Sequence, residues 1–150
     1  MIREEIQAAQ IASMKAGDKD TLGVVRLMLS AIKNRDIEMR TGKGPADDDT
    51  LVVEVLQKMV KQRRESIQMF TDGGRQELAD TEAAEIVVIE RFLPQQLSEA
   101  ETTLAIEAIK AEVGATGIKD MGRVMALLKE RHASQLDMSK ASALVKAALA

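Results

Sequence analysis

One short stretch decides the fold: LPQQLSEAE, residues 93–101. Pro94 is expected to end the helix before it, because proline lacks the backbone N–H that a helix interior requires. Ser98 and Glu101 then have the spacing of a capping box, in which the two side chains satisfy free backbone N–H groups at the start of a new helix. We therefore predict a domain boundary here, with an N-terminal helical domain over residues 1–94 and a small tail domain over residues 98–150.

Helical periodicity fills both domains. Apolar residues recur every three to four positions, and no alternating Val/Ile/Thr run is bracketed by turn residues. The chain is therefore predicted to be all-α, with about four helices in the first domain and three in the tail. The expected helices cover residues 2–15, 21–40, 50–71, 75–92, 99–113, 119–131 and 138–149.

Polar side chains at the starts of these helices are expected to act as N-caps, since their oxygens can accept hydrogen bonds from free N–H groups. We assign this role to Asp20 or Thr21 in the second helix. In the third helix we assign it to Asp49 or Thr50.

Composition limits the chemistry of the chain. It has 150 residues, no cysteine and a single histidine, His132. Disulfides, thiol catalysis and Cys/His zinc sites are thereby excluded, and a Ser-His-Asp triad could be built only on His132. His132 falls near the apolar side of its helix, which favours a place in the core or a role at the helix end.

The sequence predicts a cytoplasmic protein. No apolar run approaches the roughly 20 residues that span a bilayer, and residues 1–5 begin an amphipathic pattern instead of a signal peptide. The formal net charge of −3 argues against a globally basic nucleic-acid binder, but a local basic patch remains compatible with RNA binding.

Other motifs do not indicate a cofactor, a metal or catalysis. The glycines of residues 42–45 lack the Lys-Ser/Thr and the strand–helix context of a phosphate loop, and the aspartates of residues 47–49 lack calcium-loop spacing. Glu82, Glu85 and Glu90 are interpreted as salt-bridge residues. We expect no catalytic residue, cofactor or metal ligand.

A basic run on the third helix is the first candidate RNA-binding surface. The default interpretation is a solvated face that pairs with nearby acids, and the alternative is contact with RNA. The chain has no Trp or Tyr and only two phenylalanines, Phe70 and Phe92, so any RNA contact is expected to involve backbone and shape, with base stacking not the main mode. The run consists of Lys58, Lys61, Arg63 and Arg64.

Gly122 marks the second candidate, because glycine inside a helix costs about 1 kcal/mol relative to alanine. Gly122 and Ala126 are four residues apart and form a strip of small side chains, with Lys119 and Arg123 beside it. Such a strip lets another backbone come close. That backbone belongs either to a neighbouring helix or to a phosphodiester chain held by the two basic residues, and Glu130 on the same face tempers the second interpretation.

These residues resemble the GatB/YqeY family, stand-alone relatives of the tail of the B subunit of the tRNA-dependent Glu/Asp amidotransferase. The tail motif is matched by DMGRVM at residues 120–125, and the resemblance extends over essentially the whole chain. Further matching segments are residues 114–116, residues 143–146, RLMLSAIK at residues 26–33, RESIQ at residues 64–68, Phe70, Arg75, Leu78, Glu82, Glu85 and Leu93-Pro94.

The resemblance implies an N-terminal helical domain and a three-helix tail that helps to hold tRNA. It also carries a family label, carbon–nitrogen ligase activity with glutamine as amido-N-donor, for which this chain shows no active-site residues. Our first hypothesis is a non-catalytic adaptor that binds tRNA or other structured RNA. The alternatives are an accessory subunit of an amidotransferase, with that enzyme or translation components as partners, and a protein-interaction module with no RNA role.

Overall fold

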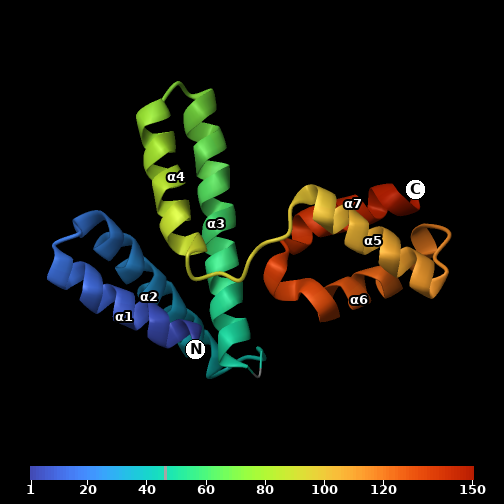
Figure 1. The fold of residues 1–150 in the computed structure, drawn as a ribbon, viewed down its shortest axis with the longest axis horizontal. Helices are drawn as coiled ribbons and strands as arrows, with labels where there is room; N and C mark the ends of the chain where they lie inside the picture. Colours follow the sequence, from blue (N-terminus) through green and yellow to red (C-terminus); the bar gives the residue numbers. More distant parts are fainter. Residues whose placement is uncertain (46) are drawn as a thin grey trace. The chain divides into compact units, whose positions relative to one another are not determined.

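The computed structural model describes residues 1–45 and 47–150. Over these residues it contains seven α-helices, two short 3-10 helices and no strand, which confirms the predicted all-α class (Figure 1). The α-helices are α1 (Ile2–Ala16), α2 (Lys19–Met39), α3 (Asp48–Asp72), α4 (Gln76–Glu90), α5 (Glu99–Val113), α6 (Met121–His132) and α7 (Met138–Leu149). The 3-10 helices are η1 (Ile118–Asp120) and η2 (Ala133–Gln135).

Internal contacts divide the chain into two compact units, Met1–Leu93 and Pro94–Ala150. Each unit buries a separate set of apolar side chains. We describe them in turn as the N-terminal unit and the tail unit.

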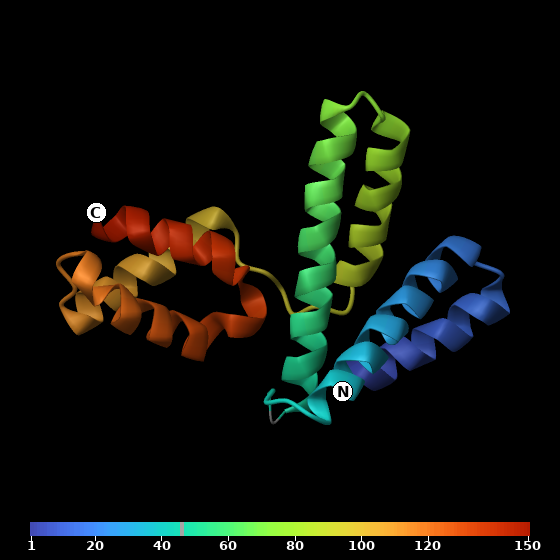
Figure 2. The same ribbon diagram turned by 180° about the vertical axis from the view of Figure 1, so that it is seen from behind.

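The N-terminal unit consists of two helical hairpins. Helices α1 and α2 lie side by side in one, and α3 and α4 lie side by side in the other, as both views show (Figures 1 and 2). The hairpins meet around side chains that are essentially inaccessible to solvent, because apolar residues three and four apart on each helix face the same way. These side chains are Ile6, Val25, Met28, Ile32, Val52, Leu56 and Ile89.

The N-caps of α2 and α3 differ from the predicted ones. Asp18 caps α2 by accepting a hydrogen bond from the Thr21 amide at 3.1 Å, and Asp47 caps α3 by accepting one from the Thr50 amide at 3.0 Å. The assignments to Asp20 or Thr21 and to Asp49 or Thr50 were therefore wrong. Both helices begin earlier than expected, so the capping aspartate also lies earlier.

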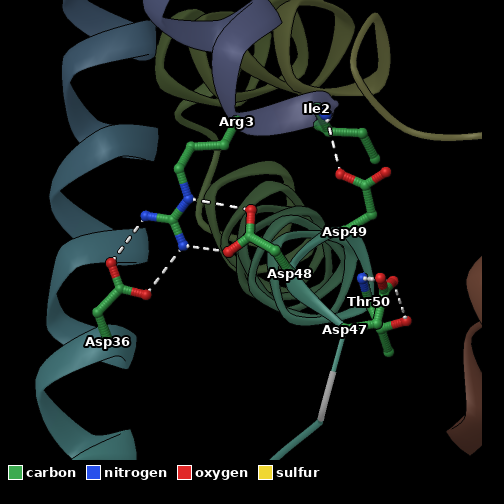
Figure 3. A network of polar contacts seen from close by, with 7 residues as sticks. All are labelled: Ile2, Arg3, Asp36, Asp47, Asp48, Asp49 and Thr50. Carbon is green, nitrogen blue, oxygen red and sulfur yellow. Dashed lines mark hydrogen bonds and ion pairs between the residues drawn. The ribbon is translucent and has the colours of Figure 1, made fainter.

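Asp48, the residue after the α3 cap, takes part in a tertiary contact with Arg3 (Figure 3). The Arg3 guanidinium donates hydrogen bonds to both carboxylate oxygens of Asp36 at 2.8 and 2.9 Å and to both of Asp48 at 2.7 and 3.1 Å. The Ile2 amide donates to Asp49 at 3.0 Å. Arg3 thus ties α1 to α2 and α3, and its hydrogen bonds lower the pKa of Asp36.

Arg3→Met is expected to destabilise the N-terminal unit by about 1–2 kcal/mol, since two partly exposed carboxylates lose charge-assisted hydrogen bonds while the apolar stem is kept. Urea unfolding followed by circular dichroism measures the change. Arg75→Met is the matched control, because its pair with Glu77 is largely exposed on both sides and its loss should have no measurable effect. Equal stability of Arg3→Met and the parent chain would contradict the structural role of Arg3.

The tail unit is a bundle of α5, α6 and α7. Its capping box is formed as predicted: the Glu101 amide donates to the Ser98 hydroxyl at 3.1 Å, and the Ser98 amide donates to the Glu101 carboxylate at 3.0 Å. The residues just before α5 also belong to the tail unit. The Leu97 amide, for example, donates a hydrogen bond to the Gln135 carbonyl at 2.9 Å. The bundle core comprises Ile106, Ile109, Val124, Leu128, Leu136, Ala141, Val145 and Leu149.

Candidate nucleic-acid interface

The turn that leads into α6 is organised by Asp120. Its buried carboxylate accepts hydrogen bonds from the amides of Thr116 at 2.9 Å and Gly117 at 3.3 Å. It also pairs with the Arg123 guanidinium at 2.6 Å. Because the carboxylate closes the loop back onto itself, residues 118–120 form a 3-10 turn and α6 begins at Met121, not at Lys119 as predicted.

The hydrogen bond from the Thr116 amide, followed by that from Arg123, lowers the pKa of Asp120 below its ordinary value of about 3.8. A lowered folded-state pKa stabilises the fold above the unfolded-state pKa, and this contribution is lost as the pH falls through the folded-state value. We therefore expect the melting temperature of the tail unit to fall as the pH drops below about 4. Asp120→Asn should lower the melting temperature at pH 7 and flatten its pH dependence, and an unchanged pH profile in this variant would contradict the role of Asp120.

The strip predicted around Gly122 is exposed. Both Gly122 and Ala126 are exposed on α6. A Cβ atom added to Gly122 would have no atom of the tail unit within 4 Å, apart from its chain neighbours and the backbone of its own helix. Within the tail unit, therefore, no neighbouring helix packs against Gly122. The strip remains available to an external backbone.

Lys119 and Arg123 are both exposed, as predicted, but they differ in their surroundings. Arg123 is held by Asp120, and its side chain is 60% exposed. Lys119 lies on η1, one residue before Asp120. Arg123 therefore presents a fixed guanidinium whose charge is partly offset, whereas Lys119 projects from the turn that precedes the helix.

Gly122→Leu is expected to keep the tail unit as stable as the parent or to raise its stability by up to about 1 kcal/mol, because the site is open and glycine disfavours helix. It should nevertheless weaken RNA binding at least tenfold if a phosphodiester backbone approaches the strip. Thermal melting and RNA titration of the same samples separate the two effects. Gly122→Ala is the matched control with a small side chain, and a lower melting temperature for Gly122→Leu would contradict the open site.

The basic run on α3 does not form one surface. Arg63 turns toward α4, where its guanidinium lies 2.8 Å from Glu85 and 3.9 Å from Glu82, and its side chain is only 13% exposed. Arg64 pairs with Glu90 of α4 at 3.2 Å. The default interpretation, pairing with nearby acids, thus describes these two arginines and the three glutamates.

Lys58 and Lys61 are exposed, and the helical periodicity places them on another side of α3 from Arg63. Glu54 and Glu65 share that side with them. The α3 run therefore offers RNA a weaker and more divided charge than its sequence suggests.

The tail unit carries a charge division that the sequence motifs did not single out. Helix α5 has Glu99, Glu101, Glu107 and Glu112 against a single lysine, Lys110. From residue 119 onward basic residues outnumber acidic ones, and two of the acids, Asp120 and Asp137, are engaged with backbone amides. The basic residues are Lys119, Arg123, Lys129, Arg131, Lys140 and Lys146.

Lys129, Lys140 and Lys146 are also exposed, and we add them to the predicted residues as candidates for phosphate contact. Arg131 differs, because it forms a bidentate pair with Glu112 of α5 at 2.8 Å. This division could have been found from the sequence by comparing the net charges of the three expected tail helices. We call Lys119, Gly122, Arg123, Ala126 and Lys129, with Lys140 and Lys146 of α7, the basic tail surface.

Residues 1–45 and 47–150 contain no group of three His, Cys, Asp or Glu side chains that could hold a metal ion. None of the helices described is both long and apolar enough to cross a membrane.

Comparison with known proteins gives one family and several relatives. A family model described as Yqey-like protein matches residues 3–149. An uncharacterized protein of Schizosaccharomyces pombe is 30% identical over 93 residues, covering 62% of this chain and 72% of that protein.

Two further relatives carry the name "Altered inheritance of mitochondria protein 41, mitochondrial". The one from Saccharomyces cerevisiae is 27% identical over 120 residues, covering 76% of this chain and 61% of that protein. The one from Lachancea thermotolerans is 29% identical over 116 residues, covering 75% of this chain and 57% of that protein. The chain thus matches less than two thirds of the length of these two proteins.

Proposed function

Because the chain belongs to the YqeY-like protein family, we propose that it is a non-catalytic adaptor that binds tRNA or another structured RNA through its tail unit. The observation that supports this proposal is the open strip of Gly122 and Ala126, which no atom of the tail unit covers at Gly122, in a unit that also exposes Lys119, Arg123 and Lys129. Lys and Arg side chains are among the main groups that contact phosphate in nucleic-acid complexes, and exposed Lys and Arg side chains are present here.

The proposed mode is recognition of backbone and shape. Phe70 and Phe92 both lie in the N-terminal unit and are only partly exposed, so the sequence of the tail unit has no Phe, Tyr or Trp on which a base could stack, and its one histidine, His132, is only partly exposed. A duplex stem offers two phosphate chains at fixed spacing, whereas a single strand is usually held by stacking. The adaptor is therefore expected to prefer folded RNA to an unstructured strand.

The resemblance to the amidotransferase tail further suggests a place beside a tRNA-dependent, glutamine-using carbon–nitrogen ligase or other translation components. In this proposal the chain positions RNA and leaves the chemistry to its partner. Adding the purified chain to such an enzyme should lower its KM for tRNA and leave kcat unchanged, because uniform binding affects KM alone.

The proposal is tested by titrating the full chain into labelled tRNA at 50–200 mM salt. If the basic tail surface neutralises about three phosphates, log K should fall with log salt with a slope of roughly −2.7. An unstructured RNA of equal length is the control and should bind more weakly. No binding at low salt, or binding that is insensitive to salt, would refute the proposal.

A further inference from the structure

The outward face of α5 carries an apolar line with no partner among the described residues of the tail unit. Ala100, Leu104, Ala108 and Ala111 recur every three to four residues, so they lie along one side of the helix. All four are exposed, and Leu104 is 71% exposed. We call this line the α5 stripe.

The opposite side of α5 faces the bundle core. Thr102, Ile106 and Ile109 are at most 4% exposed and lie half a turn away from Leu104. The α5 stripe is therefore not a poorly packed part of the core. It is a second apolar face of α5, and the first apolar face is already buried in the tail core.

The shape of the α5 stripe suits a helix better than an irregular ligand. One exposed leucine on a surface is ordinary, but here three alanines continue the line on both sides of it. Small side chains let a second helix approach to about 8 Å, the short end of the usual interaxial range. Leu104 would then fill a groove between the partner's side chains and gain burial that it lacks in this chain.

Acidic side chains border the α5 stripe on both edges. The helical periodicity places Glu101 and Glu112 on one edge and Glu107 on the other. Glu107 and Glu112 keep 55% and 52% of their side chains exposed although they pair with Lys110 and Arg131. Carboxylates on both edges disfavour RNA and favour a protein helix with basic residues at its margins.

We propose that the α5 stripe docks an amphipathic helix of a protein partner that presents an apolar ridge flanked by Lys or Arg. This site is separate from the basic tail surface, which lies on α6, η1 and α7. The tail unit would thus hold RNA on its basic side and a protein on its acidic side, as an adaptor requires.

The test uses the full chain labelled with nitrogen-15 and a synthetic helix-forming peptide with a Leu/Ala ridge flanked by lysines. We expect amide shifts on the exposed side of α5 and an affinity that falls severalfold between 50 and 300 mM salt. A peptide with glutamates in place of the lysines should bind at least tenfold more weakly. Absence of shifts on α5, or equal binding of the two peptides, would overturn the proposal.

Two substitutions locate the peptide. Leu104→Gln should weaken binding of the lysine peptide about tenfold without lowering the melting temperature, because the side chain is exposed. Leu27→Gln removes a leucine of α2 that is 51% exposed and is the matched control, with no expected effect. Self-association of the parent chain that Leu104→Gln abolishes would overturn the proposal by placing a second copy on the α5 stripe.

Discussion

Leu128→Ala is expected to destabilise the tail unit by about 2–5 kcal/mol and to leave the N-terminal unit folded. Leu128 of α6 is fully buried and belongs to the same core cluster as Ile106, Ile109 and Val145, so the substitution leaves a cavity in the tail core. A unit as small as residues 94–150 has little stability in reserve. The variant should therefore lose tail helicity near room temperature, and the proposed RNA binding should be lost with it.

Amide NMR spectra of the full chain measure this outcome unit by unit. Resonances of Pro94–Ala150 should collapse toward random-coil positions while those of Met1–Leu93 persist. Leu104→Ala, on the exposed side of the same bundle, is the control and should change stability by less than about 0.5 kcal/mol. Simultaneous loss of both sets of resonances in Leu128→Ala would show a single folding unit and contradict the division.

The second large effect is expected from charge reversal on the basic tail surface. Reversing Arg123 would place a glutamate against the buried Asp120 carboxylate and disturb the fold, so Lys119 and Lys129 are the cleaner pair. Lys119→Glu with Lys129→Glu should lower tRNA affinity at least tenfold at 100 mM salt. The slope of log K against log salt should shrink by about 1.8, since each lost phosphate contact removes about 0.9.

The matched control is Lys15→Glu with Lys33→Glu, which makes the same change in net charge on exposed positions of α1 and α2. This pair should change affinity only through the weak long-range field of the protein. An equal loss in both double variants would indicate general electrostatic attraction. Parent-like affinity in the tail variant would remove the basic tail surface from RNA binding.

Local features of the fold were predictable because they depend on neighbouring residues. The spacing of Ser98 and Glu101 identified the start of α5 correctly, and the apolar periodicity predicted a helix at the place of each α-helix that the described residues form. The first residues of α2 and α3 were predicted less accurately. Several aspartates near the starts of α2 and α3 can each act as a cap, and tertiary contacts decide among them.

Tertiary pairings were not predictable from the sequence alone. Arg3 meets Asp36 and Asp48, which are 33 and 45 residues away in sequence. Arg63 belongs to a basic run in the sequence, yet its side chain faces α4, because the packing of α3 against α4 brings Glu85 beside it. The openness of Gly122 likewise depends on where α5 and α7 pack, which helical periodicity does not specify.

The central claim, that the tail unit holds structured RNA on its basic surface, is tested most directly by an NMR footprint of tRNA on the full chain. We expect shifts or broadening at the amides of residues 119–130 and around Lys140 and Lys146, with the exposed side of α5 unaffected. A footprint on the α5 stripe, or one confined to Met1–Leu93, would contradict the account.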